Sequence, residues 1–410
     1  MPAKRVTVPP TAGLPLRLSD LRPWGNANFG KALAAWLNVP DVQLECSGTS
    51  ALMVALRTLK KIAPARNQVI LPAYTCPLVV LAVSQCGLQV RLCDLRSDAL
   101  DMDGARLRAL CNETTLAIVP THLGGRVADV RIANRCARLV GAYVIEDAAQ
   151  ALGARVYGDS VGLQGDIGLF SLALGKGLST YEGGVLIARD PALFKQLQAM
   201  HNQTIGFSLG WELRRSAELL GYAAIYRPET LDWAYGAPLR KSLAADNWIA
   251  AAGDDFDAFI PQHTLGRWRS RVGVRALGRL QEHLQSARSR AEQRIEQLAA
   301  LPGVDVVRDA APGAQGTWPV ILLRMPNRAS RDALIRAHWA SGWGLSLPFV
   351  HIVSDYLRYA PWLGSGEQGS VTVARDWAQR LVSVSNSPWL TDALFEQLCA
   401  HIAEAATRFS

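Results

Sequence analysis

The sequence has few cysteines and no long apolar run, and each of these absences argues against a class of protein. Its 410 residues include seven cysteines, an odd number that forms no Cys-x-x-Cys pair, which argues against a disulfide framework and a zinc site. No segment approaches the roughly 20 consecutive apolar residues that a membrane span requires. The seven histidines also lack the spacing of metal ligands. We therefore expect a soluble chain with reduced thiols and no bound metal.

Acidic side chains are outnumbered by basic ones, and the start of the chain has no apolar segment. Lysine and arginine total 43 against 35 for aspartate and glutamate, a formal charge of +8. The arginines are dispersed and no nucleic-acid motif appears, so we expect no nucleic-acid partner. A basic surface also suits a phosphate-bearing substrate, because the guanidinium fork matches phosphate oxygens. Residues 1–13 lack the apolar run of a secretory signal, so we expect a cytoplasmic protein.

Two segments that each contain a short apolar run carry the most chemical information. The motif at residues 144–151 begins with a short apolar strand that ends at Asp147. Residues 167–172 form a second predicted strand, which leads through a glycine turn to Lys176. A lysine amine forms an imine with the aldehyde of pyridoxal 5'-phosphate (PLP), and a carboxylate keeps the pyridine nitrogen of this cofactor protonated. Either residue alone is more often an ordinary loop or capping residue. Together they favour a PLP site.

A series of short motifs surrounds these two residues. They are Ser-Gly-Thr-Ser-Ala-Leu at 47–52, Leu-Pro-Ala-Tyr-Thr at 71–75, Pro-Thr-His-Leu-Gly-Gly at 120–125, Glu-Asp-Ala-Ala-Gln at 146–150, Gly-Asp at 165–166 with Phe-Ser at 170–171, and Glu-Gly-Gly at 182–184. In this order they resemble, nearly end to end, the DegT-type (DegT/StrS) nucleotide-sugar aminotransferases, which are PLP enzymes of fold type I. The resemblance implies an α/β fold, with a large domain built on a mostly parallel central sheet covered by helices and a smaller C-terminal α+β domain.

The resemblance also implies a role for each matching residue near the cofactor. Lys176 would form the imine with PLP and act as the general acid–base, and Asp147 would pair with the protonated pyridine nitrogen. Gln150 would approach the phenolic oxygen of the ring, and Ser171 would contact the phosphate. These four side chains define the predicted reaction centre.

Three further residues are expected to lie beside PLP. Gly48 and Thr49 precede an apolar helical stretch, so their backbone N–H groups would lie at a helix N-terminus, which attracts anions. Where the family usually has an aromatic residue that stacks on the ring, this chain has Cys76. A thiol gives less contact area, so either the phosphate site carries more of the affinity or Tyr74 turns inward. We expect Cys76 to neighbour PLP without acting as a nucleophile.

Two regions depart from the family pattern. The family's Gly-Tyr-Asn-Tyr-Arg loop, which reaches a phosphate across the dimer interface, has no counterpart in this chain. In its approximate place stand residues 264–271, whose arginines either serve a phosphate or form a solvated basic turn, and we favour the turn. Residues 206–259 are longer and more aromatic than the family pattern. They could cover the active site, enlarge a dimer interface or touch a membrane surface, and interface or core packing is the favoured interpretation.

Helical and strand patterns alternate through much of the chain and then change. Helical spacing at 29–37, 50–62, 78–84 and 130–139 alternates with short apolar runs at 69–71, 90–92, 116–119 and 143–145. This rhythm predicts a mostly parallel sheet with helices on both faces. From about residue 272 the pattern predicts a long charged helix at 280–301, strands near 304–307, 318–323 and 380–384, and a last helix at 391–407. The expected domains are an N-terminal arm (1–26), a large PLP-binding domain (27–271) holding an aromatic insertion (206–259), and a small C-terminal domain (272–410).

The function that the resemblance implies is that of a PLP-dependent aminotransferase with a ping-pong mechanism. Glutamate is the expected amino donor, and the expected acceptor is a keto sugar, nucleotide-linked, used to make a polysaccharide, a glycan or a secondary metabolite. A homodimer is expected by analogy. Lys176 argues against the family's dehydratase branch, which has histidine at that position.

Two other functions stay open. A PLP enzyme that acts on a non-sugar ketone or an amino acid would account for the unusual region at 206–259. A catalytically silent PLP-fold protein that binds a ligand or a partner would account for the missing loop and the missing aromatic residue, but retention of Lys176, Asp147 and Gln150 counts against it. His122 and His351 lie in family-like motifs, and we assign neither a catalytic role.

Overall fold

The computed structural model describes residues 6–364 and 370–408, and a sheet of seven strands forms its centre. The first five residues of the predicted N-terminal arm lie outside the described residues. The order across the sheet is β1-β9-β8-β5-β4-β2-β3. The strands are β1 (Gln43–Glu45), β2 (Gln68–Pro72), β3 (Gln89–Cys93), β4 (Thr115–Ile118), β5 (Tyr143–Asp147), β8 (Ile167–Ser171) and β9 (Gly184–Ala188).

Five neighbouring strands of this sheet run parallel, and β9 runs against them. β3, β2, β4, β5 and β8 pair in parallel, whereas β9 pairs antiparallel with both β8 and β1. Every residue of β4 and β8 is buried, as expected for strands covered on both faces. The prediction of a mostly parallel α/β sheet is confirmed.

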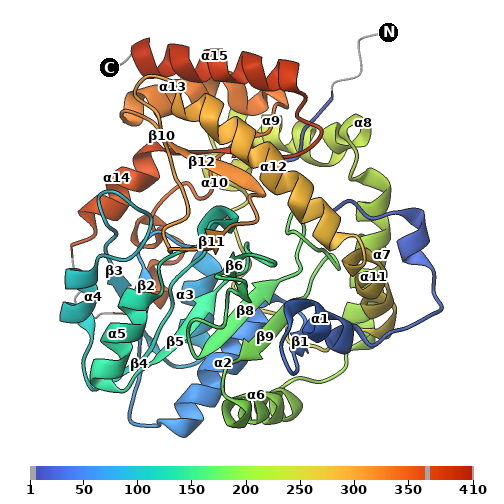
Figure 1. Cartoon of the computed structure of the whole chain (residues 1–410), viewed down its shortest axis with the longest axis vertical. Coiled ribbons are helices and arrows are strands. Elements are labelled where there is room, and N and C mark those ends of the chain that lie inside the picture. Colours follow the sequence, from blue (N-terminus) through green and yellow to red (C-terminus); the bar gives the residue numbers. More distant parts are fainter. Residues whose placement is uncertain (1–5, 365–369, 409–410) are drawn as a thin grey trace.

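Helices cover both faces of the sheet, because alternate side chains of a strand point to opposite sides. On one face Ile145 and Leu169 share a core with α2, α3 and α6. On the other face Val144 shares a core with α4 and α5, and Phe170 shares one with α1 (Figure 1). These helices, with two short 3₁₀ turns, are η1 (Leu18–Leu21), α1 (Phe29–Leu37), α2 (Gly48–Ile62), α3 (Pro77–Gln85), α4 (Gly104–Leu110), η2 (Leu123–Gly125), α5 (Arg131–Val140) and α6 (Pro191–Thr204).

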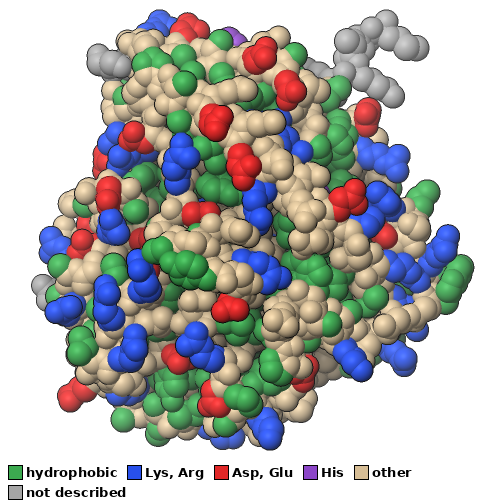
Figure 2. Space-filling view, in the orientation of Figure 1, with side chains coloured by type: hydrophobic (Ala, Val, Ile, Leu, Met, Phe, Trp, Pro, Cys, Tyr) green, Lys and Arg blue, Asp and Glu red, His purple; other side chains and the backbone are tan. Residues whose placement is uncertain are grey.

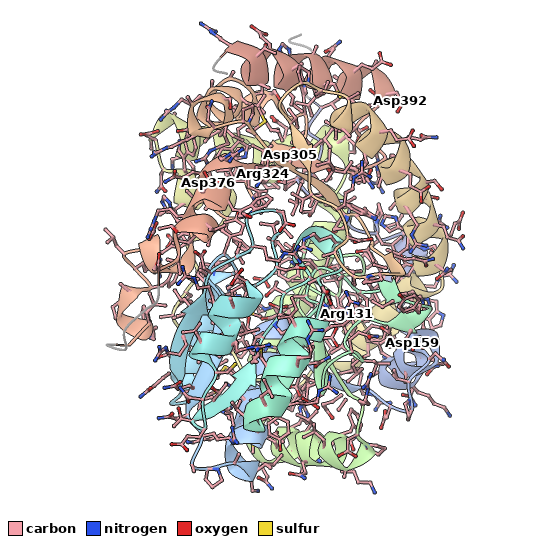
Figure 3. The ribbon with its side chains drawn as sticks, turned by 60° about the vertical axis from the view of Figure 1, so that its left-hand side comes forward. Arg131, Asp159, Asp305, Arg324, Asp376 and Asp392 are labelled. Atoms are coloured by element: carbon pink, nitrogen blue, oxygen red, sulfur yellow. The ribbon has the colours of Figure 1, made fainter. Side chains whose placement is uncertain are left out.

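An antiparallel sheet occupies the C-terminal part of the chain, in the order β10-β12-β14-β13. Helices α12, α13 and α15 share its core with Ile321 and Val384, and they form the upper part of Figure 1. Arg324 pairs with Asp305 at 2.7 Å where β12 meets β10 (Figure 3). The elements are α12 (Leu280–Ala299), β10 (Asp305–Val306), β12 (Val320–Arg324), α13 (Arg328–His338), η4 (Trp339–Ser341), β13 (Leu345–Ser346), η5 (Val353–Asp355), η6 (Ala360–Trp362), α14 (Thr372–Arg380), β14 (Leu381–Ser385) and α15 (Asp392–Arg408).

Several contacts join this C-terminal part to the central sheet, including a side-chain hydrogen bond and a strand pairing. Arg324 of β12 donates to the Ser97 carbonyl oxygen, just beyond β3, at 2.6 Å. A small sheet in the order β11-β6-β7 pairs a segment after β5 with the segment that leads into β12. Its strands are β6 (Arg155–Val156), β7 (Asp159–Ser160) and β11 (Ala314–Gln315). The two larger sheets are therefore tied by a side chain and by backbone pairing.

The aromatic insertion predicted at 206–259 is helical and contacts both large cores. Leu219 and Ala223 pack in the core of α1, whereas Leu239 and Ala251 pack in the core of the C-terminal sheet. Its elements are α7 (Leu209–Ile225), α8 (Pro228–Leu231), the π-helical turn η3 (Asp232–Gly236), α9 (Ala237–Ala244) and α10 (Trp248–Ala252), and α11 (Arg267–Leu277) follows. The insertion thus bridges the two parts of the molecule.

The face of the molecule drawn in Figure 2 shows no concentrated block of basic side chains. In Figure 2, Lys and Arg are spread over the visible face with Asp and Glu between them, as the dispersed arginines of the sequence predict. All seven cysteines are free thiols. Within residues 6–364 and 370–408, no helix has both the length and the apolar character needed to cross a membrane.

Candidate active site

One cavity of about 680 Å³ gathers the residues that the sequence singles out. We call it the lysine cavity. All seven predicted site residues line it, namely Gly48, Thr49, Cys76, Asp147, Gln150, Ser171 and Lys176. They meet because β5 and β8 are parallel neighbours, so their carboxyl ends, and the turns that follow, lie at the same edge of the sheet.

Asp147 ends β5 and presents a buried carboxylate with a single hydrogen bond. Within the described residues, its Oδ1 accepts only from the Ala149 N–H, at 3.1 Å. Its backbone is fixed on both sides, since its N–H donates to Pro120 and its carbonyl accepts from the His122 N–H, each at 2.9 Å. Burial raises the pKa of Asp147, and the Ala149 N–H and Lys176 offset this only in part. A cationic partner would stabilise the ionised carboxylate.

Lys176 lies in the turn after β8, and no hydrogen bond engages its Nζ among the described residues. Gly175 has φ +72°, a left-handed conformation that favours glycine, and a Cβ there would collide with the Thr11 hydroxyl. A Cβ on Gly13 would lie 2.9 Å from the Lys176 carbonyl oxygen, so the N-terminal segment packs directly on this turn. Burial lowers the pKa of Lys176, partly offset by Cys76 and Asp147. A lowered pKa favours the neutral, nucleophilic amine.

The N-terminus of α2 and the end of β8 form a cradle beside the lysine. Ser47 caps α2 by accepting from the Ser50 N–H at 3.0 Å. A Cβ on Gly48 would lie 3.1 Å from the Ser171 Cβ, so only glycine allows so close an approach without a shift. The Ser171 Oγ accepts from the Ala173 N–H at 3.3 Å, which leaves its own proton to donate. Free backbone N–H groups at a helix N-terminus together with a hydroxyl donor suit a phosphate.

Gln150 is held with its amide oriented by the backbone. Its Oε1 accepts from the Gly124 N–H at 2.7 Å, so both protons of its Nε2 remain as donors. Gly124 and Gly125 have φ of +70° and +76°, and a Cβ on Gly125 would collide with Pro319 and Thr317. This glycine turn therefore fixes Gln150 as a hydrogen-bond donor on the cavity wall.

Cys76 lines the cavity as the N-cap of α3 and is a poor nucleophile. Burial raises the pKa of its thiol to about 12, so the thiolate is scarce at neutral pH. Tyr74 does not compensate for the missing aromatic residue. Its hydroxyl donates to the Phe349 carbonyl at 3.0 Å and accepts from the Phe349 N–H at 3.1 Å, and its side chain is not part of the cavity wall. The idea that Tyr74 turns inward is wrong.

His122 lines the cavity but is engaged on both ring nitrogens. Its Nδ1 accepts from the Ala128 N–H at 3.0 Å, so Nε2 carries the proton and faces Glu146 Oε2 at 3.0 Å. Glu146 also accepts from the N–H groups of Gly162 at 2.9 Å and Gly165 at 2.6 Å. This buried network braces the backbone on either side of Asp147.

The insertion supplies part of the wall, which the sequence did not reveal. Trp211, Arg214 and Arg215 of α7 line the cavity, and both guanidinium groups lie over the Trp211 ring, at 5.1 and 5.0 Å. Arg215 also pairs with Glu182. Burial alone would raise the pKa of Glu182, but His263 and Arg215 outweigh this effect and hold the pKa below its usual range. The insertion packs in two cores, as the favoured interpretation of core packing predicts, and it also covers part of the site, which is another of the roles considered.

Asp254, at the end of the insertion, is a second buried carboxylate in the wall. Its Oδ2 accepts from the Val350 N–H at 2.8 Å and from the Tyr356 hydroxyl. Burial raises its pKa to about 6, although these two hydrogen bonds lower it. No sequence motif marked this residue.

The arginines expected near residues 264–271 lie away from the cavity. Arg269 is fully buried and pairs with Glu212 at 2.7 Å, and it also donates to the Glu182 carbonyl at 2.8 Å. Arg271 donates to the Gly25 carbonyl at 3.2 Å. The interpretation as a solvated basic turn is therefore wrong for Arg269, whose ion pair stabilises the contact between α7 and α11.

The chain is similar in sequence to known aminotransferases. Residues 25–224 match the DegT/DnrJ/EryC1/StrS aminotransferase family. A dTDP-3-amino-3,4,6-trideoxy-alpha-D-glucose transaminase from Streptomyces venezuelae is 34% identical over 345 residues, which are 84% of this chain and 77% of that protein. A UDP-N-acetyl-3-dehydro-alpha-D-glucosamine 3-aminotransferase from Acidithiobacillus ferrooxidans is 38% identical over 157 residues, 38% of this chain and 42% of that protein. In several such matches the chain spans less than half the length of the curated relative.

A solved structure shares the fold along nearly the whole chain. It is a sugar aminotransferase from Micromonospora echinospora, 19% identical with a TM-score of 0.71, and the match covers 97% of this chain and 100% of that one. At this identity the likeness shows the fold. Together with the long match to the Streptomyces venezuelae transaminase, the family match assigns the chain to the DegT/DnrJ/EryC1/StrS family of PLP-dependent aminotransferases.

Proposed function

We propose that this chain is an aminotransferase that moves an amino group from glutamate to a nucleotide-linked keto sugar, in the synthesis of a polysaccharide, a glycan or a secondary metabolite. The observation that carries the proposal is that one cavity holds both the Lys176 amine, which has no hydrogen bond among the described residues, and the buried Asp147 carboxylate. Each group is held away from its ordinary ionisation, which is typical of residues that do chemistry.

The residues of the lysine cavity fit PLP group by group. Among the described residues the buried Asp147 carboxylate forms no ion pair within 4 Å, and the protonated ring nitrogen would supply one. The N-terminus of α2, with Gly48 and Thr49, and the Ser171 hydroxyl would hold the phosphate. The Nε2 protons of Gln150 would face the phenolic oxygen. When bound, PLP supplies an aldehyde and an electron-accepting ring.

Lys176 is proposed to do two things in turn. Its neutral amine would hold the cofactor, and once the amino donor had displaced it, the same amine would carry a proton between two carbons. The lowered pKa of Lys176 favours the neutral amine, the form that can accept a proton. Cys76, as a neutral thiol against the ring, contributes contact and no charge.

The relatives support a nucleotide-linked substrate. The two named above act, by their names, on a dTDP-linked and a UDP-linked sugar, and this chain is expected to act on a substrate of that class. Arg214 is the natural contact for the diphosphate, because its side chain lines the lysine cavity and is 62% exposed.

We also propose that the enzyme is a homodimer and acts in the cytoplasm. Leu209, Leu213 and Leu220 are 61%, 63% and 49% exposed, and their spacing sets them on one face of α7. A second copy of the chain would cover this apolar face of α7. The free state of all seven cysteines suits a reducing compartment.

A second candidate is an aminotransferase for a non-sugar cyclic ketone. One relative, an L-glutamine:2-deoxy-scyllo-inosose aminotransferase from Streptomyces fradiae, is 32% identical over 199 residues, 47% of this chain and 46% of that protein. The wall that α7 and the segment after α10 add to the lysine cavity gives it a shape of its own, which could serve a smaller acceptor. In this case glutamine would replace glutamate as donor.

The absorption spectrum of the protein saturated with PLP tests these proposals. Conversion of the bound cofactor band by L-glutamate, reversed by a nucleotide-linked keto sugar, is the expected result. Conversion by L-glutamine, reversed by 2-deoxy-scyllo-inosose, would favour the second candidate. A bound cofactor that neither donor alters would overturn both and favour a catalytically silent PLP-fold protein.

A further inference from the structure

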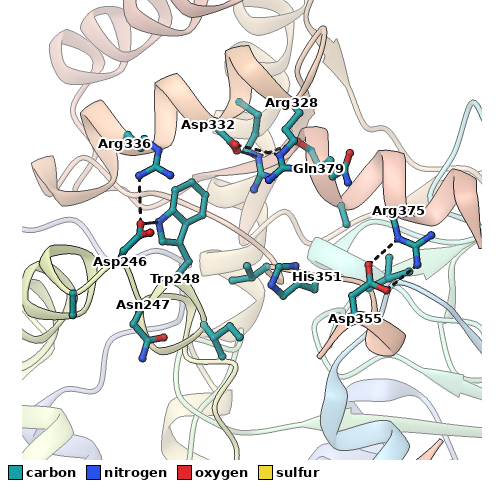
Figure 4. Close-up of a pocket in the computed structure, with 16 residues that line it drawn as sticks. Asp246, Asn247, Trp248, Arg328, Asp332, Arg336, His351, Asp355, Arg375 and Gln379 are labelled. Carbon is teal, nitrogen blue, oxygen red and sulfur yellow. Dashed lines mark hydrogen bonds and ion pairs between the residues drawn. The ribbon is translucent and has the colours of Figure 1, made fainter. Parts of the chain in front are cut away.

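A second cavity, of about 610 Å³, lies behind the wall of the lysine cavity. It is bounded by the segment that leads into α10, by α13 and α14, and by residues 350–355 (Figure 4). We call it the arginine cavity, because four arginines line it, namely Arg328, Arg331 and Arg336 of α13 and Arg375 of α14. Neither Lys176 nor Asp147 is among its lining residues.

The positive charge of the arginine cavity is only partly neutralised. Its lining holds three aspartates against the four arginines. Asp355 pairs with Arg375 through two contacts of 2.8 Å, and Asp332 pairs with Arg331 at 2.8 Å. The two remaining ion pairs are long, 3.4 Å from Arg328 to Asp332 and 3.4 Å from Arg336 to Asp246. Arg328 and Arg336 therefore have hydrogen-bonding capacity to spare.

Arg331 is the buried member of this set and is not satisfied. It is 5% exposed, and its Nε donates to the Gln379 carbonyl at 2.9 Å. Its Nη1 is buried without a hydrogen-bond partner among the described residues. Burial lowers the pKa of Arg331, and Asp332 offsets this only in part. A buried guanidinium N–H without an acceptor is costly, so this position calls for acceptor oxygens from a ligand.

We propose that the arginine cavity binds the phosphate or diphosphate group of a small molecule. Arg331 would engage it at the floor, and Arg328, which is 66% exposed, would engage it at the rim. A phosphate presents several acceptor oxygens to converging guanidinium forks. The cavity is also large enough for an organic part, and the indole of Trp248, already 5.6 and 5.0 Å from Arg331 and Arg336, offers that part an apolar surface.

The site is separate from the one proposed for PLP, although the two share a wall. Pro348 and Phe349 line the lysine cavity, whereas His351 and Ile352 line the arginine cavity. Within the insertion, α10 contributes Trp248 to one side, and the residues that follow it contribute to the other. This assignment therefore goes beyond the proposed function and does not depend on it.

Calorimetric titration of the PLP-saturated full chain with inorganic pyrophosphate tests the proposal. Saturable binding is expected, weakened about tenfold or more by Arg331→Gln and by about threefold in Arg328→Gln, whose exposed ion pair with Asp332 contributes little to stability. Two controls are matched in chemistry. Arg214→Gln tests whether pyrophosphate has entered the lysine cavity, and Arg106→Gln tests a general loss of surface charge.

The controls decide how a positive titration is interpreted. Binding that survives Arg214→Gln and Arg106→Gln within about twofold while Arg328→Gln weakens it supports the site. Circular dichroism of Arg331→Gln separates a lost contact from a lost fold. Absence of saturable binding in the wild-type protein, or equal weakening by Arg214→Gln or Arg106→Gln, would overturn the proposal.

Discussion

The lysine cavity and the arginine cavity lie on two sides of one wall, and they treat charge in opposite ways. In the lysine cavity, Asp147 accepts one N–H and the Lys176 amine has no hydrogen bond among the described residues. In the arginine cavity, Asp355 and Arg375 are bound to each other through two contacts, and Arg331 is left with one idle nitrogen. Groups that are proposed to react or to bind a ligand keep unused hydrogen-bonding capacity, which costs folding free energy. Groups that hold the structure are paired.

Hydrogen bonds in the backbone around the lysine cavity offset this loss of folding free energy. The His122 and Glu146 pair is fully buried. Both ring nitrogens of His122 and both carboxylate oxygens of Glu146 are hydrogen-bonded, which fixes the loops on either side of Asp147. The glycine turn at Gly124 and Gly125 fixes Gln150 in the same way. Rigid, hydrogen-bonded surroundings allow two buried titratable groups with unused hydrogen-bonding capacity to persist at the centre.

The largest effect is expected where the unpaired amine is removed. Lys176→Ala should lower turnover on the order of 10⁴-fold, because both the attachment of PLP and the proton transfer are lost. The melting temperature should change little, since no hydrogen bond of the Lys176 side chain stabilises the described fold. Steady-state kinetics with thermal unfolding checks both. An active Lys176→Ala protein would contradict the assignment.

Asp147→Asn keeps the shape of the side chain and removes its charge. We expect a loss on the order of 10²- to 10³-fold in kcat, because an electrostatic partner of the ring nitrogen is lost. Because burial destabilises the charged carboxylate, the protein without PLP should become no less stable. Single-turnover kinetics and urea unfolding of the PLP-free protein measure the two effects. A variant with full kcat would show that ring protonation does not depend on Asp147.

The carboxyl of Asp254 should make stability depend on pH in a defined direction. Its pKa is about 6 in the folded protein, against about 4 for an ordinary Asp. Between these values the folded chain keeps a proton that the unfolded chain releases, so this contribution is full below about pH 4 and is lost as pH rises through about 6. Asp254→Asn removes it.

The measurement is the urea midpoint from pH 4 to pH 7.5. Relative to Asp254→Asn, the wild-type free energy of unfolding should fall by about 1–3 kcal/mol as pH rises through that window. Asp257→Asn, an exposed neighbour in the same segment, serves as the matched control. Parallel curves for wild type and Asp254→Asn would refute the raised pKa.

The smallest expected effect concerns the cradle and not the charges. Gly48→Ala would place a Cβ 3.1 Å from Ser171, so the first turn of α2 must shift by a few tenths of an ångström. We expect PLP affinity to fall by several-fold and up to about tenfold, because the backbone N–H groups at a helix N-terminus must point at the anion to bind it. Fluorescence titration of the PLP-free protein measures it. Gly221→Ala in α7, where a Cβ meets nothing within 4 Å, should leave the affinity unchanged.

The sequence predicts much of the sheet and the centre of the site, because both depend on local pattern. The apolar runs of β2, β4 and β5 are short and buried, and the motifs follow them directly. Asp147 and Lys176 could be paired because parallel strands deliver their ends to one edge. The sequence alone did not show that β9 runs antiparallel, since direction leaves no trace in an apolar run.

The walls of the lysine cavity were less predictable, because distant packing positions them. Trp211 and Arg214 lie on a helix whose place is set by contacts of Leu219 and Ala223 with the core of α1. Asp254 reaches the wall through Val350 and Tyr356, about 100 residues further along the chain. Tyr74 was misjudged because the backbone of Phe349, which holds its hydroxyl, is still more remote, 275 residues further along the chain.

The segment at residues 11–14 packs against the turn that carries the reactive lysine. Leu14 donates to the Gly177 carbonyl at 3.1 Å, Ala12 to the Pro319 carbonyl at 2.9 Å and Gly13 to the Tyr226 hydroxyl at 3.3 Å. It thereby joins the lysine turn, the C-terminal sheet and the insertion. Loss of this segment would remove these three hydrogen bonds, one of which holds the turn that carries Lys176. The position of the amine therefore depends on contacts made by the chain more than 160 residues earlier in the sequence.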